Sequence, residues 1–260
     1  MGTYVVTGGT KGIGEQTVRI LRENGHDVIS MGMTQGDIAA DLGTNEGREL
    51  ALKTIRERCA DGLDGLVCNH GIAQIPMFSN SYILSVNYFG AIAIIEGLYN
   101  LLKKRSGNCV VTVSGSIAYV ERGKHFIDGL LNNCGDEERI GRLVDTFDNS
   151  AGGNIIYAST KIALSRWVRR VSSSWASHGV NINAVAPGGV MTTIMHGHEP
   201  GEDNFVYPMP ALFSKGRGML PEEVAHAIAF LVMPNASGVS GAVLYCDAGA
   251  GALRNTETYF

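Results

Sequence analysis

The chain has 260 residues, of which 45% are hydrophobic and 18% charged, and its formal net charge is −4. This length and composition fit one α/β domain whose core buries roughly three-quarters of the surface of the unfolded chain. The small negative charge and the lack of a basic run argue against nucleic acid as a partner.

Short apolar runs alternate with helical patterns from one end to the other, which predicts an α/β fold with a doubly wound parallel β-sheet and helices on both faces. We expect strands at 4–7, 27–31, 38–40, 64–68, 109–113, 180–184 and 242–246. We expect helices at 12–24, 45–60, 82–104, 157–177 and 222–233. Leu50 and Ile55 should supply the apolar face of the second helix, and Pro221 should start the last one. Nothing resembles a linker or a repeat, so one domain over 1–260 is predicted.

Two segments interrupt the alternation. Residues 118–154 form an insertion with helical patterns near 126–131 and 136–147, and residues 191–213 form an apolar loop. Loops this long in a compact domain are usually functional or disordered, and the apolar content of the second argues against disorder. We expect the second loop to contact the substrate, with packing over the sheet as the alternative.

The cysteines indicate the cellular compartment, and the longest apolar run bears on whether the chain spans a membrane. Five scattered cysteines without a CxxC pair predict reduced thiols in a cytoplasmic protein, and neither disulfides nor a zinc site. The chain start leaves no room for a signal peptide before the first strand. The run 83–102 approaches the length of a membrane span but carries Asn87, Glu96 and Asn100, so a buried helix is predicted.

A glycine-rich turn, Thr7-Gly8-Gly9-Thr10-Lys11-Gly12-Ile13-Gly14, joins the first strand to the first helix. Glycine lets the backbone approach a pyrophosphate, and a helix N-terminus offers free N–H groups and a positive dipole end. The spacing departs from the usual Gly-x-Gly-x-x-Gly fingerprint. The turn predicts a dinucleotide site that includes Thr7, Gly8, Thr10, Lys11, Gly12, Ile13 and Gly14.

The choice of dinucleotide depends on charge near the second strand. Sites that prefer NAD place an acidic residue after that strand, whereas residues 30–34 here contain none. Lys11 can meet a 2′-phosphate, and a unit charge pair in contact gains about 1 kcal/mol in water and about 4 at an intermediate dielectric. We therefore expect NADP(H) to be preferred over NAD(H), the alternative being that Lys11 is a solvated turn residue.

Four polar residues form the predicted catalytic set. Tyr157 and Lys161 lie one helical turn apart and point the same way. An ammonium beside a tyrosine favours the phenolate, which makes Tyr157 an acid for reduction and a base for oxidation. Ser116, just past a strand, is expected to donate to the substrate oxygen, with Ser114 as the alternative inside the strand. Asn87 is expected to bond a water or a backbone carbonyl towards Lys161, with a structural role as the alternative.

These motifs, together with Pro187-Gly188 and Thr192, resemble the short-chain dehydrogenase/reductases over the whole chain. The resemblance implies a Rossmann fold with seven strands and an ordered Asn-Ser-Tyr-Lys site. It also implies that Asn69 and Gly71 line the adenosine side of the cofactor and that Thr192 holds the nicotinamide carboxamide. The other residues expected at the cofactor are Asp41, Leu42, Tyr157, Lys161, Pro187, Gly188 and Val190.

Within the family, segments 64–67, 85–91, 152–154 and 253–256 resemble the bacterial hydroxysteroid dehydrogenases and carbonyl reductases. The resemblance implies an oxidoreductase that interconverts a hydroxyl and a ketone on a steroid or bile acid, as a homodimer, with a tetramer as the alternative. The interval from Ser116 to Tyr157 matches this subgroup, which favours Ser116. Alternatives are reduction of a 3-oxoacyl thioester on acyl carrier protein, general carbonyl reduction and non-catalytic NADP sensing.

Three histidines and one glycine depart from the family pattern or invite another interpretation. Gly32 replaces the acid of NAD-using members of the subgroup. His70 replaces the usual alanine and either touches the cofactor ribose or fills space. His196 and His198 lack further ligands at a suitable spacing, so no metal is expected.

Overall fold

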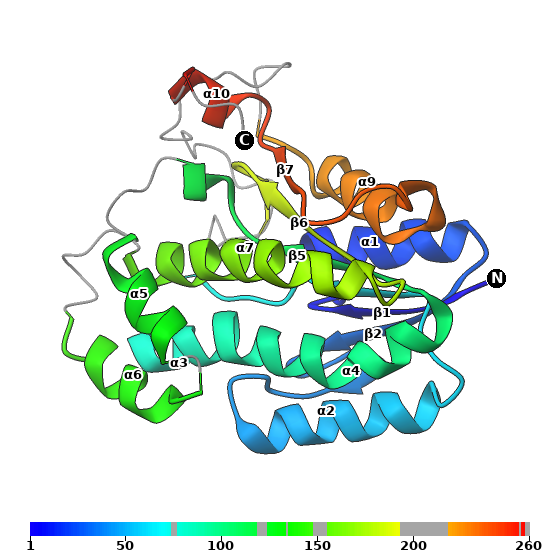
Figure 1. Cartoon of the computed structure of the whole chain (residues 1–260), viewed down its shortest axis with the longest axis horizontal. Coiled ribbons are helices and arrows are strands. Elements are labelled where there is room, and N and C mark those ends of the chain that lie inside the picture. Colours follow the sequence, from blue (N-terminus) through cyan, green and yellow to red (C-terminus); the bar gives the residue numbers. More distant parts are fainter. Residues whose placement is uncertain are drawn as a thin grey trace.

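Seven parallel strands form one sheet in the order β3-β2-β1-β4-β5-β6-β7 in the computed structural model (Figure 1). The strands are β1 (Thr3–Thr7), β2 (Asp27–Gly32), β3 (Ile38–Ala39), β4 (Gly65–Cys68), β5 (Asn108–Thr112), β6 (Asn181–Pro187) and β7 (Val243–Cys246). The structure describes residues 1–73, 77–118, 124–133, 135–147, 155–192, 218–254 and 256–257. The order reverses between β1 and β4, so the predicted doubly wound Rossmann fold is confirmed.

Helices cover both faces of the sheet. One face carries α2 (Asn45–Arg58), α4 (Ala91–Arg105) and α7 (Ile155–Ala176), and the other carries α1 (Gly12–Glu23) and α9 (Pro221–Val232). Along β1, Val5 belongs to the first core, whereas Tyr4 and Val6 belong to the second. Because successive side chains of a strand point to opposite faces, covering both faces requires continuously apolar strands.

The predicted apolar face of α2 is wrong in one position. Leu50 is 51% exposed, whereas Ala51 and Ile55 are fully buried. The buried face also includes Arg48, which is 7% exposed. Positions 48, 51 and 55 share one side of a helix with 3.6 residues per turn, so an arginine occupies the stripe that faces the core.

The predicted helix at 82–104 is one helical stretch of changing type. It begins as α3 (Asn80–Leu84), passes through a π-helical turn, η1 (Ser85–Gly90), and continues as α4. By length and composition the stretch could cross a membrane, but 61% of its most apolar window is buried inside the protein, as in a core helix. The π turn contains Asn87, and such turns are rare and frequent at functional sites.

Other elements extend or add to the predictions. β6 runs to Pro187, and α10 (Ala250–Arg254) follows the last strand. Short 3₁₀ turns occupy η2 (Gly115–Ala118) and η4 (Pro234–Ala236). The four cysteines in the described part of the chain are free thiols, and Cys134 lies outside it.

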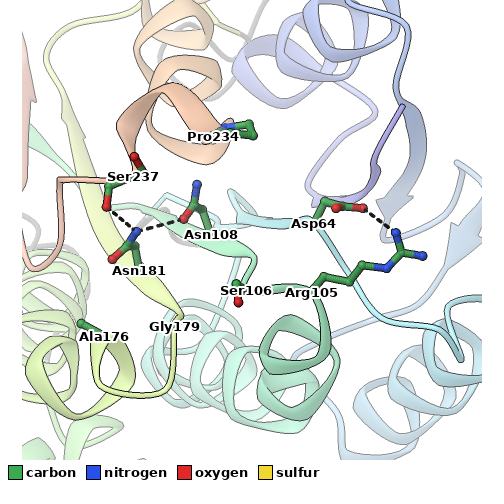
Figure 2. A pocket seen from close by; sticks show the side chains of 9 residues that line it. All are labelled: Asp64, Arg105, Ser106, Asn108, Ala176, Gly179, Asn181, Pro234 and Ser237. Atoms are coloured by element: carbon green, nitrogen blue, oxygen red, sulfur yellow. Dashed lines mark hydrogen bonds and ion pairs between the residues drawn. The ribbon is translucent and has the colours of Figure 1, made fainter.

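A cavity of about 350 Å³ lies at the amino-terminal ends of β5 and β6 (Figure 2). The Asn108 carboxamide donates to the carbonyl oxygens of Val232 and Met233 at 3.2 and 3.1 Å. Asn181 donates to Asn108 Oδ1 at 3.3 Å and to the Ser237 carbonyl at 3.1 Å. These bonds hold the end of α9 to the sheet, and the cavity lies at the strand ends opposite the glycine turn.

The predicted insertion contains two helices, α5 (Lys124–Asn132) and α6 (Glu137–Val144), which pack beside α7 and α3 (Figure 1). Asn80 Nδ2 donates to the carbonyls of Val144 and Phe147, both at 2.9 Å. These bonds attach the end of α6 to the start of α3.

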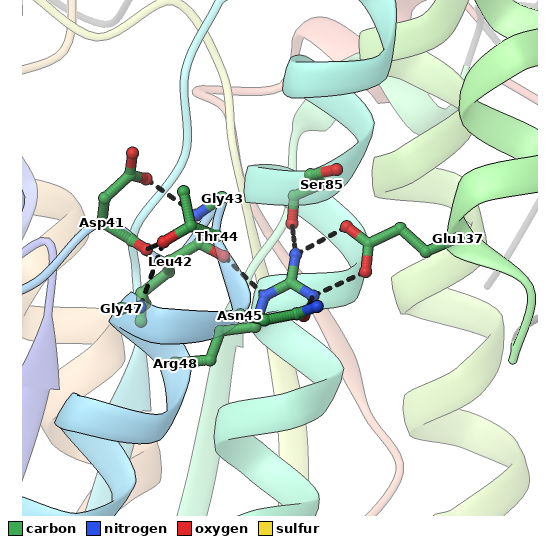
Figure 3. A network of polar contacts seen from close by, with 9 residues as sticks. All are labelled: Asp41, Leu42, Gly43, Thr44, Asn45, Gly47, Arg48, Ser85 and Glu137. Atoms are coloured by element: carbon green, nitrogen blue, oxygen red, sulfur yellow. Dashed lines mark hydrogen bonds and ion pairs between the residues drawn. The ribbon is translucent and has the colours of Figure 1, made fainter.

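Arg48 provides an ionic link to the same helix (Figure 3). Its guanidinium donates to both carboxylate oxygens of Glu137, at 2.6 and 2.7 Å. It also donates to the carbonyls of Leu42 at 2.7 Å and Ser85 at 3.0 Å. Since Arg48 is nearly buried, Glu137 compensates a charge that is largely withdrawn from water.

We expect Glu137→Gln to lower the free energy of unfolding by about 1–3 kcal/mol, because Arg48 keeps its buried place and loses its carboxylate partner. Denaturant midpoints at unchanged m-value measure the effect. Glu138→Gln is the matched control, since Glu138 pairs with Arg142 in solvent, and it should cost less than about 0.5 kcal/mol. Equal losses in the two variants would show that the Arg48 pair is no stronger than a surface pair.

Candidate active site

The glycine turn lies at the carboxyl ends of the strands, where the strand order reverses. Gly8 and Gly12 have φ of +62° and +54°, values that side chains rarely tolerate. A Cβ at Gly8 would lie 2.8 Å from His70 Cα, and one at Gly14 would lie 2.0 Å from the Gly8 carbonyl oxygen. The turn therefore packs directly on the chain that leaves β4.

The start of α1 fits a phosphate group. Lys11 is the N-cap residue and makes no side-chain cap bond, so the first N–H groups of the helix lack a side-chain partner. A Cβ at Gly12 would meet the side chain of Thr192 at 3.2 Å. The residue predicted to hold the nicotinamide carboxamide thus lies over the glycine turn, and this donor set fits a dinucleotide.

The end of β2 has no room for an acidic side chain at position 32. A Cβ on Gly32 would lie 2.6 Å from Thr10 Oγ1. The nearby carboxylate of Asp37 accepts hydrogen bonds from Ser30 N at 2.8 Å and Ser30 Oγ at 2.7 Å. Burial alone would raise the pKa of Asp37, but these bonds and the Arg22 guanidinium lower it. The Asp37 carboxylate is therefore engaged within the protein.

His70 joins the ends of β1 and β4. Thr7 Oγ1 accepts bonds from the backbone N–H groups of Asn69 and His70 at 3.1 and 3.3 Å, and lies 2.7 Å from His70 Nδ1. Burial, followed by the charge of Lys161, lowers the pKa of His70 to about 3, so the ring is neutral. The Thr7 hydroxyl also lies 3.4 Å from the Val67 carbonyl oxygen, to which it donates, so the donor in its contact with Nδ1 depends on the imidazole tautomer. His70 is therefore more than a space filler.

Asn87 holds the segment after β4 from the other side. Its side chain is fully buried, donates to the Ile72 carbonyl at 2.9 Å and accepts from Ile72 N at 2.8 Å. A Cβ on Gly71 would lie 3.2 Å both from Asn87 Oδ1 and from Lys161 Nζ. Asn87 and Lys161 meet at Gly71, so the structure brings these three predicted residues together.

Lys161 lies in the interior beside Tyr157. Its Nζ is 5.7 Å from the centre of the Tyr157 ring and donates to the Thr112 carbonyl at 3.4 Å. Burial lowers the pKa of Lys161 to about 8, partly opposed by the Cys68 thiol. Burial raises the pKa of Tyr157, opposed by a hydrogen bond with Ser114. The expected lowering of the tyrosine pKa by Lys161 is wrong for this structure, because burial dominates and the ammonium lies over the ring.

Ser114 forms a hydrogen bond with Tyr157. β5 ends at Thr112, so Ser114 lies beyond the strand. The sequence had suggested a position inside the strand, and that prediction is wrong. Ser116 belongs to η2, and its side chain lies outside the described part of the structure. The interval to Tyr157 favoured Ser116 in the sequence, whereas the hydrogen bond to Tyr157 in the structure comes from Ser114.

The remaining predicted residues lie at strand ends around the turn. The Asp41 carboxylate accepts from Tyr82 Oη at 3.0 and 3.1 Å, and Leu42 is buried. Pro187 ends β6, and a Cβ on Gly188 would lie 2.7 Å from Asp247 Cα. The sequence motifs did not indicate Arg48 or Asp247, although the helical spacing of 48, 51 and 55 was a signal for Arg48.

The apolar loop at 191–213 is described only at its start. Val190 pairs with Met219 in an isolated parallel bridge, which places Thr192. His196 and His198 lie outside the described residues. Within the described ranges, no group of three or more His, Cys, Asp or Glu side chains is placed to hold a metal ion.

Comparisons with known proteins agree with this geometry. A family model described as short chain dehydrogenase matches residues 3–127, and one described as enoyl-(acyl carrier protein) reductase matches residues 144–251. The 3-alpha-hydroxysteroid dehydrogenase/carbonyl reductase of Comamonas testosteroni is 34% identical, over 99% of this chain and all of that protein. The chain belongs to the short-chain dehydrogenase/reductase family.

Other short-chain dehydrogenase/reductases are similar at different levels. The crystal structure of the 3-alpha-hydroxysteroid dehydrogenase from Pseudomonas sp. B-0831 with NADH superimposes with a TM-score of 0.86 at 35% identity, covering 99% of this chain and 100% of that one. The 3-oxoacyl-acyl-carrier-protein reductase FabG of Vibrio harveyi is 27% identical over 94% of this chain and 95% of that protein. Family members are oxidoreductases that use NAD(H) or NADP(H) on hydroxyl and carbonyl groups, so the chain is an enzyme of this class.

We expect Ser114→Ala to slow turnover by about 10²-fold, because the hydroxyl beside Tyr157 is lost. The Ser114 bond lowers the pKa of Tyr157, so its removal should raise that pKa and shift the pH profile of alcohol oxidation to higher pH. Steady-state rates measured from about pH 6 to about pH 11, in steps of roughly half a pH unit, report both effects. Ser116→Ala is the matched control, and a larger loss with the same shift in that variant would restore Ser116 to the predicted role.

Proposed function

We propose that this chain is an NADP(H)-dependent oxidoreductase that interconverts a hydroxyl and a ketone on a steroid or bile acid. The observation that carries the proposal is full-length similarity, at 34% and 35% identity, to two bacterial proteins named as 3-alpha-hydroxysteroid dehydrogenases. The meeting of Asn87, Tyr157 and Lys161 at the carboxyl edge of the sheet supports a catalytic role and weighs against a non-catalytic NADP sensor.

Each side chain has a distinct part in the proposed reaction. When bound, the nicotinamide ring supplies or receives the hydride. Tyr157 gives its phenolic proton to the ketone oxygen, and its raised pKa keeps that proton in place near neutral pH. A serine hydroxyl, from Ser114 or Ser116, polarises the same oxygen. Lys161 stays next to Tyr157 through its bond to the Thr112 carbonyl.

The cofactor preference rests on the surroundings of the adenosine end. Gly32 leaves no space for an acid, and Asp37 is already bonded to Ser30 and Arg22. Lys11 is exposed and makes no ion pair within the described residues. A 2′-phosphate would therefore meet a free cation and no competing carboxylate, which favours NADP(H) although the Pseudomonas enzyme was crystallised with NADH.

A second candidate is reduction of a 3-oxoacyl group carried on acyl carrier protein. The similarity to the Vibrio harveyi reductase and the match over residues 144–251 favour it. Arg166, Arg169 and Arg170 lie exposed on α7 and offer a cationic surface to an acidic carrier. The lower identity places this function behind the steroid reaction.

We also propose that the enzyme is a cytoplasmic homodimer. β7 is the edge strand of the sheet, where Leu244 is 39% exposed, and Phe230 on the neighbouring α9 is 47% exposed. Exposed apolar side chains on an edge strand and the helix beside it favour association with a second copy over a free edge.

Reduction of 3-, 7-, 12- and 17-keto steroids with NADPH should proceed at one ring position, read from nicotinamide absorbance over time. Tyr157→Phe should slow it by at least about 10²-fold, because the proton donor is lost. An acetoacetyl thioester of acyl carrier protein serves as the competing substrate. Turnover of the thioester without turnover of any steroid would reject the steroid assignment and favour the second candidate.

Lys11→Ala is expected to raise the KM for NADPH about tenfold and to leave the KM for NADH within about twofold, since only NADPH carries the 2′-phosphate. Lys53→Ala is the matched control, because Lys53 is an exposed lysine on a different helix, α2, and this variant should change neither KM. An unchanged NADPH KM in Lys11→Ala would assign Lys11 to solvent and remove the basis for the preference.

A further inference from the structure

A second cavity, of about 390 Å³, lies among α5, α6, α3 and α7. Its walls are mainly aliphatic and include Leu84, Leu130, Ile140, Val144 and Ile156. Such a volume falls within the range of small-molecule sites. The function proposed above does not involve this cavity, and none of the residues assigned to that function lines it.

The cavity is on the back of the catalytic helix. Tyr157 and Lys161 share one side of α7, one turn apart, whereas Ile156 and Ser159 line the cavity. Ser159 follows Tyr157 by two positions, which turns it roughly 200° around the helix axis. A ligand in this cavity would be separated from the catalytic cleft by the helix itself.

The outer wall of the cavity is held in place by bonds to the rest of the protein. α6 supplies Ile140 and Val144. It is fixed by the Arg48–Glu137 ion pair (Figure 3) and by hydrogen bonds from the Asn80 carboxamide. These links connect α6 to α2 and α3, which belong to the body of the fold. The cavity is therefore a built feature between anchored helices.

Within the described residues, one exposed cation at the cavity has no ion-pair partner. Arg139 lines the cavity, and its guanidinium makes no ion pair with any described residue. The neighbouring acids of α6 are engaged elsewhere: Asp136 caps the helix by accepting from Arg139 N, Glu137 pairs with Arg48, and Glu138 pairs with Arg142. An aliphatic cavity beside a free guanidinium matches a ligand with an apolar chain and one carboxylate.

We propose that this cavity binds a medium-chain fatty carboxylate, with the alkyl chain between α5, α6 and α7 and the carboxylate at Arg139. Gly129 on α5 provides the means of testing it. Gly129 lines the cavity, and a Cβ built there has no neighbouring heavy atom within 4 Å. A side chain at this position enters the cavity without a clash, and replacing a helical glycine favours the helix.

The test is calorimetric titration of decanoate into the full-length protein with a saturating nicotinamide dinucleotide present. Decanoate should bind the wild type at one site, and Gly129→Leu should raise its Kd at least about tenfold by filling the cavity. Gly129→Ala is the matched control and should stay within about threefold, since one methyl group leaves most of the volume. Thermal midpoints no lower than that of the wild type establish that Gly129→Leu is folded.

The charge is tested separately. Arg139→Gln should weaken decanoate binding about fivefold and leave the binding of decanol unchanged, whereas Arg142→Gln should affect neither ligand. Absence of saturable decanoate binding to the wild type would overturn the proposal. Equal affinity of wild type and folded Gly129→Leu would overturn it as well, because the chain would then bind elsewhere, including the catalytic cleft.

Discussion

The close approach of the glycine turn to the end of β4 is the contact on which the site depends. Gly8 lies against His70, and the Thr7 hydroxyl receives two backbone N–H groups from the segment that follows β4. With the turn in that place, Gly71 falls next to Asn87 and Lys161. A side chain at Gly8 or Gly14 would separate the two strand ends, and with them the dinucleotide turn and the catalytic residues.

α7 serves two surfaces at once. Its front carries Tyr157 and Lys161, and its back packs against α5 and lines an aliphatic cavity. The position of α6, the other helix at that cavity, depends on a buried ion pair between Arg48 and Glu137. Arg48 also binds the carbonyls of Leu42 and Ser85, so one guanidinium joins α6, the chain after β3 and the π turn that contains Asn87.

Burial governs the electrostatics of the site. It lowers the pKa of Lys161 to about 8 and that of His70 to about 3, and it raises the pKa of Tyr157. Each shift favours the neutral form of the group, as expected where water is excluded. Tyr157 is thus a proton donor at neutral pH, and its hydrogen bond with Ser114 acts in the opposite direction by lowering its pKa.

The sequence by itself determined the alternation of strands and helices, the glycine turn and the pairing of Tyr157 with Lys161, because these follow from local periodicity and from residues that only one conformation accepts. Tertiary structure decided the rest. Arg48 is buried because a carboxylate arrives on α6 from a distant part of the chain, whereas Leu50 lies on the exposed side of the same helix. Ser114 reaches Tyr157 because β5 ends at Thr112, and strand ends depend on pairing between strands that no local pattern specifies.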